Sequence, residues 1–224
     1  PGGRGNDYIP LYITTGFGRL GHLGVDIDPS LAIKSLNRLD NWINKSYRNV
    51  LKHGKKEDNH MSSTIALYLY GRSFFLKQQK INPNAREAVD YYLGQAKKYW
   101  LELGNRQSQG HVALALQRFG KDKDTPKAIM RSLKERSVSH EEMGMFWRDE
   151  ELSWWWHRAP IETQAVMIEA FDEVMNDQKS VEDCKVWLLK QKQTQDWKTT
   201  KATADAVYAL VLRGSDLLAS DELV

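Results

Sequence analysis

Apolar residues recur along this chain at the three-to-four-residue spacing of amphipathic helices, and strand-like alternation is nearly absent. The helical segments alternate between two kinds. The first kind is short and rich in small or apolar residues, and we expect it at residues 62–75, 109–119, 161–174 and 200–212. The second kind is more charged, and we expect it at residues 31–51, 85–103, 126–136 and 181–191. This alternation predicts an all-α protein built from antiparallel helix hairpins.

A local pattern recurs in the first kind of segment: a small polar residue, then alanine, then an aliphatic or aromatic pair. It starts near Ser63, Gln109, Glu162 and Ala202, a spacing of about 40 to 50 residues that is typical of helix-pair repeats. Small residues let a helix approach neighbours on several sides, as an inner ring requires, and amphipathic partners would cover that ring from outside. We therefore predict one helical domain over residues 1–224, an α/α toroid with inner and outer rings. An open solenoid is the alternative, disfavoured by the unequal spacing.

Helix boundaries carry their own signals. N-terminal caps are expected at Asp28-Pro29, Asn84 and Thr125-Pro126, and helix ends at Gly54, Gly104, Gly120 and Gly214. Residues 137–158 interrupt the helical rhythm and are expected to form a long loop, where function often resides.

Charge and cysteine content exclude several classes of protein. Thirty-two basic residues stand against twenty-nine acidic ones, so no excess of positive charge points to a nucleic-acid partner. The densest basic cluster, Lys52, Lys55 and Lys56, precedes two acids and is expected to be a solvated loop. The one cysteine, Cys184, permits no intrachain disulfide and no cysteine-based zinc site. No apolar run approaches the roughly 20 residues of a membrane-spanning helix.

Three segments resemble a known family. Residues 1–9 read PGGRGNDYI and lead into GFGRL at residues 16–20, and residues 159–165 read APIETQA. The third and most specific segment reads WLLKQ at residues 187–191 and WKTTKATADA at residues 197–206. Together they resemble the thioester-type helical domain of bacterial alpha-2-macroglobulin-like proteins.

The resemblance implies a toroid of about six helix pairs, of which this chain would hold about five. It also implies that the chain is a piece of a very large multidomain protein of the cell envelope, periplasmic or lipid-anchored. Such a protein is an endopeptidase inhibitor that traps proteases, so its partners would be its own other domains and the target proteases. A membrane contact would come only through a lipid anchor outside this segment, and the domain would not be an enzyme.

Thioester-bearing members of the family carry Cys-x-Glu-Gln, whose Cys and Gln side chains form an internal thioester that a target nucleophile attacks. Cys184 is followed by Lys185-Val186-Trp187 and does not match that motif. The family places the motif before the position that matches Pro1. No catalytic residue and no cofactor can therefore be carried over to this chain. With Glu182 and Asp183 beside it, Cys184 is expected to be a half-buried hydrophobe.

The strongest candidate for a partner surface is a run of aromatic and basic residues. Three consecutive tryptophans cannot all face one core on a regular helix, and Trp and Arg are enriched in interface anchors. We expect this loop to plug or line the mouth of the toroid, together with a tryptophan that fastens a later interhelical loop. The residues concerned are Trp154, Trp155, Trp156, His157, Arg158 and Trp197.

Two enzyme classes built on α/α toroids remain as alternatives, beside a plain interaction scaffold. The acids Asp149, Glu150 and Glu151 lie next to the tryptophans, but adjacent acids on one loop rarely reach the facing geometry of a glycosidase. The sequence Asp26-Ile27-Asp28-Pro29 and the acids Asp172, Glu173 and Asp177 only approximate the acidic motifs of isoprenoid enzymes. The six histidines show no metal-binding spacing, so no metal site is predicted.

Overall fold

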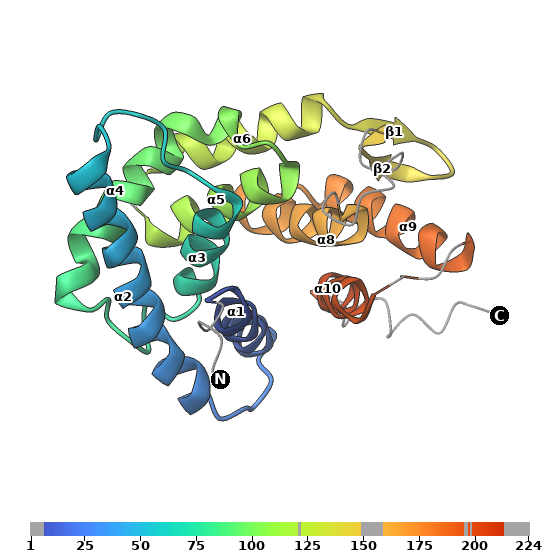
Figure 1. Ribbon diagram of the computed structural model, residues 1–224. Helices are drawn as coiled ribbons and strands as arrows, with labels where there is room; N and C mark the ends of the chain where they lie inside the picture. Colours follow the sequence, from blue (N-terminus) through green and yellow to red (C-terminus); the bar gives the residue numbers. More distant parts are fainter. Residues whose placement is uncertain (1–6, 121, 149–158, 195–196, 198, 213–224) are drawn as a thin grey trace. The chain divides into compact units, whose positions relative to one another are not determined.

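The computed structural model describes residues 7–120, 122–148, 159–194, 197 and 199–212, and over these the chain is mostly helical (Figure 1). The all-α prediction is therefore confirmed. Contacts between residues divide the chain into two compact units, residues 1–126 and 127–224. Each unit is described separately below, and the single-domain toroid stays a prediction.

In unit 1, helices that are next but one along the chain pack against each other, and α1 also packs against α2. Helix α3 lies between α1 and α5, and α2 packs against α4. The row α1–α3–α5 thus consists of every second helix along the chain. The bounds are α1 (Tyr8–His22), α2 (Ser30–His53), α3 (Ser63–Ser73), α4 (Pro83–Tyr99), the 3₁₀ turn η1 (Trp100–Glu102) and α5 (Arg106–Phe119).

Unit 2 repeats this arrangement on a smaller scale. Helix α8 packs against α10, the next helix but one, while α9 contacts α8 and the strand β2. Helix α6 begins at the end of unit 1 and lies mostly in unit 2. The bounds are α6 (Asp124–Glu135), β1 (Val138–His140), β2 (Gly144–Phe146), α8 (Pro160–Ala170), the π-helical η2 (Phe171–Met175), α9 (Gln178–Thr194) and α10 (Thr200–Val211).

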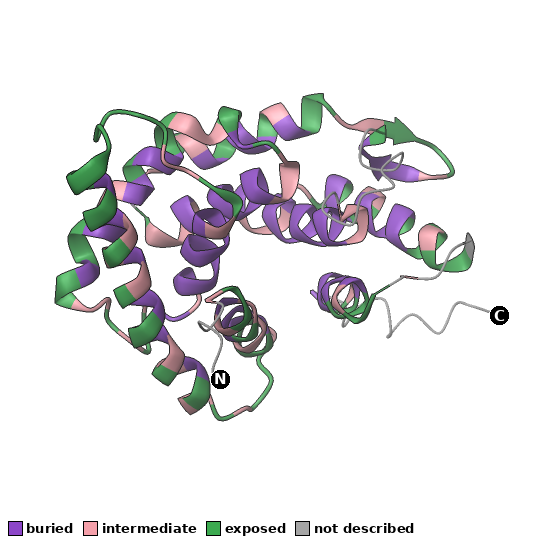
Figure 2. Cartoon of the chain, viewed as in Figure 1, coloured by how far each residue is buried: buried purple, intermediate pink, exposed green. Residues whose placement is uncertain are grey.

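Burial separates the two kinds of helix (Figure 2). Helices α3, α5 and α8 each bury nine consecutive residues, so every side of these helices is covered. Helix α2 buries only a stripe at three-to-four-residue spacing, from Ala32 through Leu36, Leu39 and Ile43 to Val50. The predicted small-residue helices are covered on all sides at α3, α5 and α8, whereas α10, predicted to be of the same kind, buries one face and exposes Val207 and Val211.

Two predicted caps were placed two or three residues too late. The side chain of Asn82, not Asn84, caps α4 and accepts a hydrogen bond from the Asn84 N–H at 3.1 Å. At α6, Asp122 accepts the Thr125 N–H at 2.9 Å, so Thr125 does not act as the cap. In both cases an Asx side chain upstream reaches the free N–H groups first. The predicted ends at Gly54 and Gly120 are confirmed, and Gly120 adopts the left-handed conformation.

A short hairpin replaces part of the long loop expected at residues 137–158. Strands β1 and β2 pair antiparallel, with Val138 opposite Phe146, and β2 is buried against α9. The Trp147 Nε1–H donates to the Leu133 carbonyl at 2.9 Å and fastens the hairpin to α6. The prediction of a loop was wrong for this part, and residues 149–158 lie outside the described residues.

No described helix combines the length and the apolar character that crossing a bilayer requires.

Gly144 provides a test of the hairpin's packing. It has a φ of 75°, and a Cβ there would overlap the Asp183 carbonyl oxygen of α9. Gly144→Ala should lower the free energy of unfolding of unit 2 by about 3 kcal/mol, through backbone strain and overlap with backbone atoms. Urea denaturation followed by tryptophan fluorescence measures this loss.

Gly94 is the matched control, because it lies within α4 and a methyl group added there would meet open space. Gly94→Ala should raise stability by about 0.5 to 1 kcal/mol through helix propensity. Equal effects of the two substitutions would contradict the close contact at Gly144.

Candidate functional site

The residues predicted to form a partner surface fall mostly outside the described structure. Trp154, Trp155, Trp156, His157 and Arg158 all lie there, as do the acids at positions 149–151.

Trp197 is described and lies half-buried between α9 and α10. The Lys192 ammonium lies 5.6 Å from the centre of its ring, and the Thr203 hydroxyl donates to its carbonyl oxygen at 3.5 Å. These contacts link the end of α9 to the first turn of α10. They agree with a tryptophan that fastens the interhelical connection, and its partner role stays a prediction.

Cys184 lies on α9 and is fully buried, so the expected half-burial was an underestimate. Burial, reinforced by the carboxylates of Asp183 and Asp177, raises the pKa of the Cys184 thiol well above its usual range. A thiol that stays protonated and inaccessible is not a nucleophile at neutral pH. The Gln164 side-chain amide of α8 donates to the Cys184 carbonyl at 3.2 Å and to the Met145 carbonyl at 2.6 Å. These hydrogen bonds therefore connect α8 to α9 and to the hairpin.

A cluster of cationic and aromatic side chains joins the three helices of the row in unit 1. We call it the Tyr70 cluster, and it consists of Arg19, Tyr70, Phe74, His111 and Arg118. The Arg19 Nε–H donates to the Tyr70 hydroxyl at 3.0 Å, and its guanidinium carbon lies 5.5 Å from the ring centre. The Arg118 guanidinium lies 5.4 Å from the Tyr70 ring and 4.2 Å from the Phe74 ring. The His111 ring stacks on Tyr70 at 4.6 Å.

The Tyr70 cluster lets small, apolar helices carry positive charge. Each guanidinium over a ring face is attracted by the ring quadrupole, by about 0.5 to 2 kcal/mol depending on desolvation. Of these residues, His111 was considered from the sequence only as one of six histidines without metal-binding spacing, and the structure buries it. The signal that could have revealed the cluster is an arginine on a helix otherwise made of small and apolar residues, as at Arg19.

A buried ion pair forms a second polar centre in unit 1. The Asp40 carboxylate of α2 accepts hydrogen bonds from the Tyr68 hydroxyl at 2.8 Å and from the Arg72 Nε–H at 3.0 Å, both on α3. Its other oxygen accepts the Asn82 N–H at 3.1 Å, just before α4. Burial, followed by the negative charge of Asp40, raises the pKa of Tyr68 well above its usual range. One carboxylate therefore connects three helices.

Polar side chains also line the contact between α8 and α10 in unit 2. The Lys201 ammonium lies 3.4 Å from a Glu162 oxygen and 3.7 Å from an Asp205 oxygen. Glu162 and Asp205 are both buried, so a lysine held between them offsets their charge. A glycosidase would need two carboxylates facing a sugar, whereas these two face a lysine.

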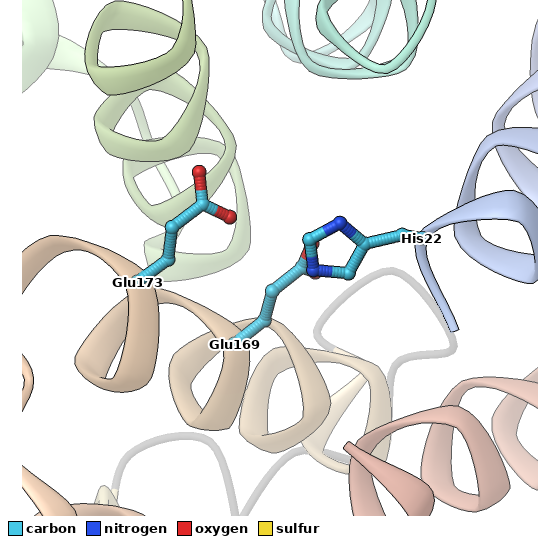
Figure 3. Close-up of side chains that lie close together, drawn as sticks. All are labelled: His22, Glu169 and Glu173. Atoms are coloured by element: carbon cyan, nitrogen blue, oxygen red, sulfur yellow. The ribbon is translucent and has the colours of Figure 1, made fainter. Parts of the chain in front are cut away.

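Further along α8, Glu169 and Glu173 project from successive turns, Glu173 from η2 (Figure 3). Figure 3 also draws His22, which belongs to unit 1. The Glu169 carboxylate is buried and accepts the Tyr208 hydroxyl of α10 at 2.9 Å. This bond adds a second polar link between α8 and α10.

Among the acids compared with isoprenoid enzymes, Asp28 and Asp177 accept backbone N–H groups at helix starts, and Asp172 accepts a side-chain amide. Asp28 accepts the Ser30 N–H at 3.0 Å at the start of α2. Asp177 accepts the Ser180 N–H at 3.2 Å at the start of α9 and pairs with Lys134 of α6. Asp172 accepts the Gln178 side-chain amide at 2.8 Å. In the described chain, these carboxylates thus bind their own helix termini and neighbouring side chains.

No family model matches the chain, and no curated protein matches it. The family resemblance therefore depends on the residues quoted above. In the described residues, Asp40, Glu162, Glu169 and Asp205 each contact a basic or tyrosine side chain from another position. This geometry favours stabilising contacts between helices over proton transfer to a substrate.

The Asp40–Arg72 pair yields a stability prediction. Asp40→Ala leaves the Arg72 guanidinium buried without its carboxylate, so the free energy of unfolding should fall by about 3 to 5 kcal/mol. The double variant Asp40→Leu with Arg72→Met removes both charges and should recover part of this loss. Urea denaturation of the three proteins gives the values. A loss below about 1 kcal/mol in Asp40→Ala would contradict the buried pair.

Asp122 yields a pH prediction. The Lys97 ammonium lies 2.6 Å from its carboxylate and, together with the Thr125 bonds, holds the pKa of Asp122 well below its usual range. Because the folded-state pKa is lowered, the stabilisation is complete above the unfolded value of about 3.9 and declines as pH falls below it. Asp122→Ala should cost about 1 kcal/mol at pH 7, and the difference from wild type should shrink by pH 3. Urea denaturation at pH 7, 5 and 3 measures it.

Lys97→Met is the companion variant for this test, because Lys97 is largely exposed and its bond to Asp122 is the largest cause of the lowered pKa. It should reduce the same pH dependence while leaving the cap in place. An unchanged pH dependence in Lys97→Met would assign the effect to other groups.

Proposed function

We propose that this chain is the helical thioester-type domain of an alpha-2-macroglobulin-like endopeptidase inhibitor of the bacterial cell envelope. In this proposal it belongs to a larger multidomain protein that entraps proteases, and it acts as a folded, non-enzymatic module. Its partners are the other domains of that protein and the captured protease. Its place in the periplasm or on a lipid anchor is part of the same proposal.

The observation that carries the proposal is the packing of alternate helices. In unit 1 the small-residue helices α3 and α5 pack on each other and α1 contacts α3, while the amphipathic helices α2 and α4 pack on each other and α2 also contacts α1. In unit 2, α8 and α10 pack in the same way. Repeated hairpins with an inner and an outer member are the building unit of an α/α toroid. The closed ring, with about five of six pairs in this chain, belongs to the proposal.

The segments that resemble the family form helices or helix starts in the structure. Residues 8–20 form most of α1, and Pro160 opens α8, which buries Glu162 through Ala170. Thr199 caps α10 by accepting the Ala202 N–H at 3.0 Å, which explains the Thr-x-x-Ala pattern. Because these segments form helix caps and packed helices here, their resemblance to the family supports a fold shared with that family. Function follows from this only through the resemblance, because a fold hosts many activities.

The chemistry of this chain supports a module without its own nucleophile. Its one cysteine is buried and lacks the Glu-Gln that a thioester would need. Covalent capture would therefore require residues outside this chain, and entrapment itself requires only that a cut elsewhere in the larger protein rearranges its domains. No described geometry favours the glycosidase or isoprenoid alternatives over this one.

The test uses the full protein that contains this chain, mixed with an active serine protease such as trypsin and separated by gel filtration. We expect the protease to elute with the large protein and to cleave a small chromogenic peptide while sparing casein, because entrapment excludes large substrates. Trypsin with a covalently blocked active-site serine cannot cut a bait segment and should elute alone. Full activity on casein in the co-eluting fraction, or no co-elution, would refute the proposal.

A further inference from the structure

The exposed side of helix α2 carries basic residues along most of its length and no acidic residue. At 100° per residue and 1.5 Å rise, five lysines and arginines fall within a sector about 80° wide and about 27 Å long, opposite the buried stripe. The one acidic residue of the helix, Asp40, faces inward and binds Arg72. We call this surface the α2 ridge, and it consists of Lys34, Arg38, Lys45, Arg48 and Lys52.

The N-terminal half of the α2 ridge is partly offset by acids nearby. The Arg38 guanidinium lies 2.9 Å from the Asp7 carboxylate, which precedes α1. Lys34 attracts Asp28, which lies just before α2. These two basic residues therefore share their charge with the chain itself.

The C-terminal half of the α2 ridge is not offset in this way. Among the described residues, no carboxylate lies within ion-pair distance of Lys45, Arg48 or Lys52. Arg48 instead lies three residues after Lys45 and four before Lys52, and like charges at these spacings destabilise a helix. The helix dipole favours a cation only in the last turn, which holds Lys52. An anionic surface outside the chain accounts for the arrangement, because it would neutralise all three charges together.

The surroundings of the α2 ridge determine which anionic surface it fits. Helices α1 and α4 both pack against α2, so the ridge lies within a layer of helices and does not project as a free helix. Such a ridge can lie along a flat surface, whereas reading duplex DNA requires a helix that enters the major groove. No aromatic side chain of α2 is exposed, so the stacking that holds single-stranded nucleic acids is missing there. Leu31, 64% exposed on the same side, suits the apolar boundary below lipid headgroups.

We propose that the α2 ridge binds the anionic headgroups of a phospholipid bilayer, with α2 lying along the membrane surface. Lysine and arginine side chains reach the headgroups through their long aliphatic stems. The net charge of +3 does not reveal this surface, because acids elsewhere in the chain nearly balance its basic residues. The inference depends on α2 and its neighbours, and not on protease entrapment.

Cosedimentation of the full protein that contains this chain with lipid vesicles tests the proposal. We expect binding to vesicles made of equal parts of phosphatidylglycerol and phosphatidylcholine, which weakens as salt rises from about 0.05 M to about 0.5 M. The triple variant Lys45→Gln, Arg48→Gln, Lys52→Gln should bind these vesicles about a hundredfold more weakly. The factor follows because each basic side chain at an anionic membrane strengthens binding about fivefold.

A second triple variant, Lys123→Gln, Lys127→Gln, Arg131→Gln, is the matched control. It removes the same charge from exposed positions in α6 and just before it. Its binding should stay within about twofold of wild type, because charges outside a surface contact are screened by salt. Circular dichroism checks that both triple variants remain helical.

Equal binding of the ridge variant and wild type to the anionic vesicles would overturn the proposal, and so would no binding of wild type. Equal losses in the two triple variants would also overturn it, because they would show an effect of net charge alone. Binding to a fluorescent DNA duplex that the ridge variant loses, without vesicle binding, would assign the ridge to nucleic acid instead. Vesicle binding without protease capture would retain the α2 ridge and reject the proposed function, so the two can fail separately.

Discussion

Close contact between helices that carry small residues determines how unit 1 is built. Gly71 of α3 lies against Thr15 of α1, and Gly18 of α1 lies against Phe74, each so near that a methyl group would overlap its neighbour. Such approaches bring backbones together and leave α3 with no exposed side. The amphipathic helices can then cover the row with a single apolar stripe, as α2 does.

Burying a helix on every side also buries its polar side chains, and their partners come from neighbouring helices. Asp40 joins α2, α3 and the start of α4, whereas Lys201 sits between two carboxylates of α8 and α10. A buried charge is tolerated only when it is paired and hydrogen-bonded. These pairs therefore restrict which helices can be neighbours and in which register. They give each unit a defined packing.

This construction is consistent with a module whose role is to hold shape while other parts of a large protein move. Two arginines of unit 1, Arg19 and Arg118, lie over the Tyr70 ring, and the Cys184 thiol is buried.

The sequence by itself determined the helical class, the alternation of two kinds of helix and the ends at Gly54 and Gly120, because periodicity, composition and glycine conformation act locally. The sequence did not predict α1, because three glycines and Pro10 weaken its helical signal. Packing in the folded unit stabilises the helix despite that weak signal. The sequence also missed the hairpin, since Gly144 is required by a contact with Asp183 on a distant helix. The Tyr70 cluster and the Asp40 network depend on which helices become neighbours, so only the tertiary structure could decide them.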